Sequence, residues 1–158
     1  MQAGDIAMVK TTAIWGALIR VFTRSRYDHA VLILNDRGLA VEAVPSGARY
    51  CYVQPEDIVV SPPLTSDQRL VVRAKGHALI GTRYNFLDVG LLGLAQLGVR
   101  AEWLRKRLAR ADRLFCSQLI DLALQDAGYH LFEDGRLPQN VSPGDLADLA
   151  FREGWPRA

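Results

Sequence analysis

The residues of this chain with the clearest potential for chemistry lie at the opening of a predicted helix. The run from Leu114 to Ile120 begins a helical pattern of apolar residues that ends at Gly128, and Cys116 lies in its first turn. A cysteine at this position is close to unpaired backbone N–H groups and to the positive end of the helix dipole, and both favour the thiolate. Cys116 is therefore a candidate nucleophile.

Cys116 also has a purely structural interpretation. It shares one face of the predicted helix with Leu119, Ile120, Ala123 and Ala127, and free cysteine is among the most frequently buried residue types. A nucleophilic thiol differs from a core thiol in needing a base within hydrogen-bond reach and a third group that orients the base.

Three histidines are candidates for that base. His77 falls inside a predicted helix and His130 in the loop after the cysteine helix, and both positions favour a structural role. His29 directly precedes the apolar run from Ala30 to Leu34. A polar residue at the end of a strand can face a cleft without interrupting the core, so His29 is the candidate base.

The partner of His29 follows from a predicted hairpin. The runs Ala30 to Leu34 and Leu39 to Ala43 are joined by a short turn that ends in glycine. Residues near the two open ends of a hairpin lie opposite one another, and Glu42 is near the open end of the second strand. We predict that Glu42 accepts the second ring N–H of His29, favours the imidazolium and thereby stabilises the thiolate.

Two alternatives accompany this assignment. Asp28 is also close to His29, but as its sequence neighbour it should point to the opposite face, so it ranks second. Glu42 between Val41 and Ala43 could equally be an ordinary strand residue that faces solvent.

The elements that must position these residues are predicted in the order strands first, helices later. Beside the hairpin, the sequence predicts a first strand over Gly4 to Lys10 and a third meander strand at about Arg49 to Gln54. A short helix capped by Thr11 or Thr12 follows the first strand. Strands followed by helices indicate an α+β fold with helices packed on one side of a small, mostly antiparallel sheet.

Four later helices complete the expected fold. The first runs from about Asp67 to Ile80, is capped by Thr65 or Ser66, and is expected to turn Leu70, Val71, Ala74 and Ala78 inward. The other three are an apolar helix (Leu87 to Leu97), a basic amphipathic helix (Glu102 to Ala111) and, after the cysteine helix, a last helix with Ser142 as its cap and Pro143 in its first position.

Composition narrows the classes of function. With 158 residues, 49% of them hydrophobic, the chain is expected to form one domain over residues 1–158. Two cysteines do not make a disulfide framework, and Cys51 is expected to pack on the third meander strand. No secretory leader opens the sequence and Val89 to Val99 is too short to span a bilayer, so a cytoplasmic location is the default expectation.

Ligands other than a substrate are not expected. The histidines and cysteines lack the spacing of metal ligands, so we predict no metal site and no cofactor. The span from Arg100 to Arg113 holds six basic and two acidic residues, but Trp103 is its one aromatic residue, so we expect no nucleic-acid binding.

The motifs together resemble the NlpC-type branch of papain-like cysteine peptidases, in circularly permuted order. In the usual order a Gly-x-x-Tyr motif and a Cys-Ser helix precede a Gly-Asp turn, a strand that begins with histidine and a short strand that ends in a polar residue and alanine. Here the modules run Gly4-Asp5-Ile6, His29-Ala30-Val31, Val41-Glu42-Ala43, Gly81-Thr82-Arg83-Tyr84 and Phe115-Cys116-Ser117. This order is similar to that of the permuted YiiX/YaeF-like amidases, from Gly4 to about Leu146.

The resemblance implies a papain-like fold and a division of roles. Cys116 would be the nucleophile, His29 the general base and acid, and Glu42 the group that orients His29. Tyr84 would help to stabilise an oxyanion together with the backbone N–H of Cys116, although a packed aromatic residue is the alternative for this position. The implied enzyme is a thiol hydrolase that cleaves a peptide or cell-wall-type amide through a thioacyl intermediate.

Two other functions remain open at the level of sequence. One is a lipid-directed acyltransferase or esterase that uses the same site and contacts a membrane peripherally through Leu87 to Arg113. The other is a binding module, that is, a protein that has kept the fold but not the catalytic activity, and that binds a partner through the cleft where an enzyme would hold its substrate. The sequence leaves the natural substrate and the oligomeric state undetermined.

Overall fold

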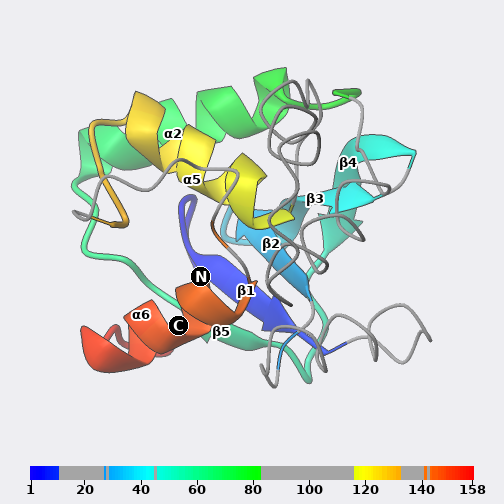
Figure 1. The fold of residues 1–158 in the computed structure, drawn as a ribbon. Coiled ribbons are helices and arrows are strands. Elements are labelled where there is room, and N and C mark those ends of the chain that lie inside the picture. The colour runs from blue at the N-terminus through cyan, green and yellow to red at the C-terminus, as the bar shows by residue number, and fades with distance from the viewer. Residues whose placement is uncertain (11–26, 28, 45, 83–115, 133–140, 142) are drawn as a thin grey trace, which may run out of the picture.

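The described part of the molecule is a sheet with helices on it. The computed structural model describes residues 1–10, 27, 29–44, 46–82, 116–132, 141 and 143–158. Within these ranges the chain forms a five-stranded antiparallel sheet and three helices (Figure 1). The predicted α+β class is confirmed.

The sheet has the strand order β4-β3-β2-β1-β5. The meander is present as predicted, with β2 (His29–Ile33), β3 (Leu39–Val44) and β4 (Gly47–Tyr52) joined in sequence. The side-chain oxygen of Asn35 accepts the backbone N–H groups of Arg37 and Leu39, each at 3.0 Å, and so closes the hairpin turn. An Asx-type turn of this kind explains why asparagine begins the connection.

The two remaining strands lie on the other side of β2. The predicted first strand is β1 (Ile6–Val9), which pairs with β2 and, on its other side, with β5 (Ile58–Val60). The sequence did not predict β5, because three residues are too few to show an alternating pattern. Val60 also forms a bridge with Arg157, which brings the end of the chain to this edge of the sheet.

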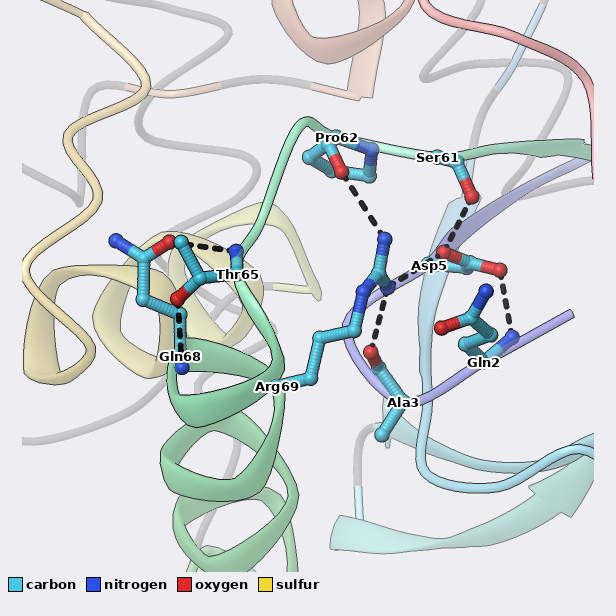
Figure 2. Close-up of polar contacts among 8 residues, drawn as sticks. All are labelled: Gln2, Ala3, Asp5, Ser61, Pro62, Thr65, Gln68 and Arg69. Atoms are coloured by element: carbon cyan, nitrogen blue, oxygen red, sulfur yellow. Dashed lines mark hydrogen bonds and ion pairs between the residues drawn. The ribbon is translucent and has the colours of Figure 1, made fainter.

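Three predicted helices are confirmed. They are α2 (Ser66–Ala78), α5 (Cys116–Asp126) and α6 (Pro143–Arg152). Thr65 caps α2 in a capping box: its hydroxyl accepts the N–H of Gln68, whose side chain accepts the N–H of Thr65 (Figure 2). Pro143 occupies the first position of α6, where its missing N–H costs nothing.

The predicted inner face of α2 is wrong. Leu70 and Val71 are 64% and 42% exposed, Ala74 and Ala78 are exposed as well, and the buried residues are Val72 and Gly76. A Cβ added at Gly76 would lie 2.4 Å from Cδ2 of Leu34. The helix therefore approaches the sheet along the stripe that contains glycine, because only that stripe permits so close a contact.

A buried ion pair fixes α2 to the beginning of β1 (Figure 2). The Asp5 side chain is 1% exposed, and its Oδ1 accepts hydrogen bonds from Nη1 of Arg69 at 2.9 Å and from the hydroxyl of Ser61 at 2.5 Å. Arg69 also donates to the carbonyls of Ala3 and Pro62. The Gly-Asp motif of the sequence therefore has a structural function here. The Asp5 carboxylate accepts hydrogen bonds from the segment before β1, from Ser61 after β5 and from Arg69 of α2.

The main core lies between the sheet and the helices. Helices α2 and α5 lie side by side over one face of the sheet, and α6 lies near β1 and β5 (Figure 1). The buried residues of this main core include Ile6, Leu32, Val41, Leu119 and Leu146. A second buried cluster on the other face contains Ala7, Val31, Ile33, Ala40 and Val59.

Several expectations fall outside the described residues. They are the helix after Thr11 or Thr12, the apolar helix, the basic helix and the cap at Ser142. Among the described residues, no helix has the length and apolar character needed to cross a membrane.

Candidate active site

Three of the predicted site residues meet where α5 reaches the sheet. Cys116 is the first residue of α5 and is 6% exposed, His29 is the first residue of β2, and Glu42 lies in β3. Helix α5 contacts both strands. Residues 87 positions apart in the sequence, His29 and Cys116, are thus neighbours in space.

The histidine and the glutamate form a close pair. Nε2 of His29 lies 3.0 Å from Oε2 of Glu42, and the two side chains are only 15% and 14% exposed. Val41 and Ala43, on either side of Glu42, point into the main core, which leaves Glu42 facing away from it. Because Nε2 is engaged with Glu42, the nitrogen left for Cys116 is Nδ1, and the ring can bridge the thiol and the carboxylate.

The thiol is poised to ionise. Burial alone raises the pKa of Cys116, but the hydrogen bond with His29, the charge of His29 and the backbone N–H groups of Ala30 and Ser117 lower it further than burial raises it. The net pKa of Cys116 is below the usual value of a cysteine. Its position at the start of α5 acts in the same direction, because the helix dipole favours an anion there.

The histidine is poised to hold a proton. Burial on its own lowers the pKa of His29, but hydrogen bonds to Cys116 and Glu42 and the charges of these two groups raise it to about 10. The hydrogen bond from His29 lowers the pKa of Glu42. All three shifts favour a thiolate–imidazolium pair next to an ionised carboxylate.

Arg49 is a member of this cluster that the sequence reasoning missed. It lies directly opposite Glu42 in the pairing of β3 with β4, and its Nε donates to Oε1 of Glu42 at 2.8 Å. The cross-strand register was the available signal, since Glu42 and Arg49 lie on adjoining strands of the predicted meander at positions that face one another.

Ser117 anchors the beginning of α5. Its side chain is buried and its hydroxyl donates a hydrogen bond to the carbonyl oxygen of Val141. The serine that follows the cysteine therefore ties the first turn of the helix to the segment before α6. This tie helps to fix where the thiol lies.

The second cysteine differs from the first. Cys51 lies in β4, and burial together with the charge of Glu42 raises its pKa to about 12. Its sulfur is a protonated thiol at neutral pH, whereas that of Cys116 is biased towards the thiolate. The reactivity of Cys116 can therefore be compared with that of Cys51 in the same molecule.

The other candidate residues do not join the cluster or cannot be placed. His77 pairs with Tyr50, whose hydroxyl lies 2.8 Å from Nδ1 of the ring, and His130 is exposed after α5. Tyr84 and Asp28 lie outside the described residues.

Comparison with known proteins identifies a shared fold. No protein-family model and no curated protein matches the sequence. The crystal structure of the metalloprotein yiiX from Escherichia coli O157:H7 is similar, with a TM-score of 0.59 and 21% sequence identity. The likeness covers 97% of this chain and 82% of that one. At this level of identity it shows that the two chains have a common fold.

Proposed function

We propose that this protein is a cysteine hydrolase that cleaves an amide bond, of peptide or cell-wall type, through a thioacyl intermediate on Cys116. The observation that carries the proposal is the linked set of Cys116, His29 and Glu42, in which a buried thiol has a lowered pKa and a histidine has a raised one. A structural cysteine packed in apolar surroundings would have its pKa raised instead, as Cys51 does.

Acylation starts from the thiolate–imidazolium pair. The sulfur of Cys116 attacks the carbonyl carbon of the amide and forms a carbon–sulfur bond. The imidazolium of His29 then donates its proton to the amide nitrogen, the carbon–nitrogen bond breaks, and the amine leaves. Glu42 keeps the ring of His29 oriented and balances its charge before the proton moves.

Deacylation returns the site to its starting state. Neutral His29 takes a proton from water, and the hydroxide so formed attacks the thioester carbon. The carbon–sulfur bond breaks, the acid leaves and the thiolate forms again beside the imidazolium. The backbone N–H groups at the start of α5 are suited to stabilise the oxyanion of each tetrahedral intermediate. Tyr84 stays a prediction for the same role.

We assign the chain to the circularly permuted, NlpC-type papain-like group. Two observations support this. The histidine-led strand and the acidic strand precede the cysteine helix in the chain, which is the permuted order, and the fold is shared with yiiX over nearly the whole chain.

The likeness to a protein described as a metalloprotein raises the question of a bound metal. Among the residues that the structure describes, no group of three or more His, Cys, Asp or Glu side chains is placed to hold an ion. The described residues therefore do not fit a bound metal, and no step of the proposed reaction is written through one.

The proposal is tested by trapping the acyl-enzyme. The purified protein is treated with activated p-nitroanilides of short peptides and with a fatty-acyl p-nitroanilide, quenched in acid and examined by peptide mass spectrometry. We expect the peptidyl acyl group as a thioester on Cys116 in wild type and in Cys51→Ser, but not in Cys116→Ser. A fatty-acyl thioester without a peptidyl one would favour the lipid-directed alternative, and no adduct with either substrate would favour the binding module.

A further inference from the structure

Both oxygens of the Glu42 carboxylate are engaged, and by different partners. Oε2 faces Nε2 of His29 at 3.0 Å, and Oε1 accepts the Nε–H of Arg49 at 2.8 Å. The cluster is therefore a chain of four groups, from Arg49 through Glu42 and His29 to Cys116. Arg49 is its outermost member, with 64% of its side chain exposed against 14% for Glu42.

The backbone fixes where Arg49 can act. Strands β3 and β4 pair in register from Leu39 and Tyr52 to Val44 and Gly47, so Glu42 and Arg49 are held opposite one another. A carboxylate with one hydrogen bond is free to turn about its side-chain torsions, whereas one with a partner on each oxygen has a defined plane. The orientation of that plane decides whether Oε2 points at His29.

We infer that Arg49 is a positioning residue of the proposed hydrolase, which holds the Glu42 carboxylate in the orientation that binds His29. The inference rests on the proposed function, because it gives Arg49 a part in keeping Cys116 and His29 ready to react. Arg49 itself does not touch Cys116 among the contacts of the described residues.

A purely electrostatic effect of Arg49 is the competing explanation, and it predicts an opposite sign. The charged groups that influence His29 are Cys116 from α5, Glu42 from β3 and Asp57 from the turn before β5. If Arg49 acted only by its positive charge, its removal would raise the pKa of His29, because a like charge disappears. If Arg49 positions Glu42, its removal lowers the pKa of His29, because the carboxylate turns away.

The experiment compares Arg49→Met and Arg49→Lys with wild type. Arg73→Met, which removes an exposed arginine of α2, is the matched control. Two quantities are measured: the pKa of His29 from an NMR titration of its ring, and the rate of alkylation of Cys116 by iodoacetamide at mildly acidic pH. Assignment of the His29 signal uses the loss of one signal in His29→Ala.

For Arg49→Met we expect a lower pKa of His29 and alkylation slowed by roughly fivefold, the scale of a partly exposed ion pair. Arg49→Lys should recover most of the rate, and Arg73→Met should match wild type. An unchanged or raised pKa of His29 in Arg49→Met would overturn the positioning role. Slow alkylation of Cys116 in wild type would instead overturn the proposed function, so the two failures are distinguishable.

Discussion

Replacement of Glu42 by glutamine probes the charge that supports the histidine. Glutamine has the shape of glutamate, but it has one acceptor oxygen where the carboxylate has two. In wild type both oxygens accept, one from His29 and the other from Arg49. In Glu42→Gln one of these two donors must therefore face an amide NH2 group, and the bond that survives is no longer to a charged acceptor.

The magnitude follows from the two kinds of hydrogen bond. A hydrogen bond to a charged group contributes about 1.5–3 kcal/mol and a neutral one about 0.5–1.5 kcal/mol. The difference, about 1–1.5 kcal/mol, corresponds to about one pKa unit. We expect the pKa of His29, which is about 10 in wild type, to fall by about this amount in Glu42→Gln. An NMR titration of the His29 ring measures it.

The same substitution has a signed effect on stability. The folded pKa of His29 is raised above its reference value of 6.5, so its contribution is full below that value and is lost as the pH rises through about 10. The pKa of Glu42 is lowered from 4.5, so its contribution is present above that value and is lost as the pH falls. The stability difference between wild type and Glu42→Gln should therefore be full between pH 4.5 and pH 6.5. It should shrink as the pH falls below 4.5 and as the pH rises through about 10. A difference that does not vary with pH, or an unchanged pKa of His29, would refute the reasoning.

Three further predictions concern the framework. Gly76→Ala places a Cβ 2.4 Å from Leu34, so we expect a loss of about 1–3 kcal/mol in the free energy of unfolding, measured by urea denaturation; an unchanged midpoint would contradict the close approach of α2. Arg69→Met leaves the Asp5 carboxylate, 1% exposed, without its counterion, so thermal unfolding should show a loss of about 3–5 kcal/mol, whereas Arg73→Met should show none. Burial raises the pKa of Asp121, so its charged form destabilises the fold at neutral pH. Asp121→Asn should therefore raise the melting temperature at neutral pH and lose that gain below pH 3.8, where the aspartate is itself neutral. A gain that persists in acid would exclude desolvation as its cause.

The sequence was most informative about features that depend on residues close together in the chain. The hairpin turn after β2, the cap of α2, predicted at Thr65 or Ser66, and the start of α5 at Cys116 each depend on residues within a few positions of one another. Glu42 could be nominated for the same reason, since a hairpin with a short turn fixes which residues of its two strands are neighbours.

Features that depend on contacts between distant parts of the chain were less predictable from the sequence. Four apolar residues of α2 offered an inner face, but the sheet packs against Val72 and Gly76 because a glycine allows a closer approach than a larger side chain. Strand β5 has three residues and is defined by its pairing with β1 rather than by its own pattern. Arg49 was not predicted, because its contact with Glu42 depends on the register of β4 against β3.

The contact of Cys116 with His29 is the link that sequence spacing cannot supply. It joins the beginning of a helix to the beginning of a strand far away in the chain, and it depends on how α5 lies on the sheet. The buried hydroxyl of Ser117, bonded to Val141, is one of the contacts that set this placement. Two features of the sequence suggested the contact in advance: the position of His29 at the end of a strand and the resemblance in the order of the motifs.

The most direct test of the central claim is the rate at which iodoacetamide alkylates Cys116 as a function of pH, read by peptide mass spectrometry. Cys51, whose pKa is raised to about 12, serves as the internal control in the same tube, and His29→Ala is measured alongside. We predict fast labelling of Cys116 that persists into mildly acidic pH and is lost in His29→Ala. Labelling no faster than that of Cys51, or labelling that is the same without His29, would contradict it.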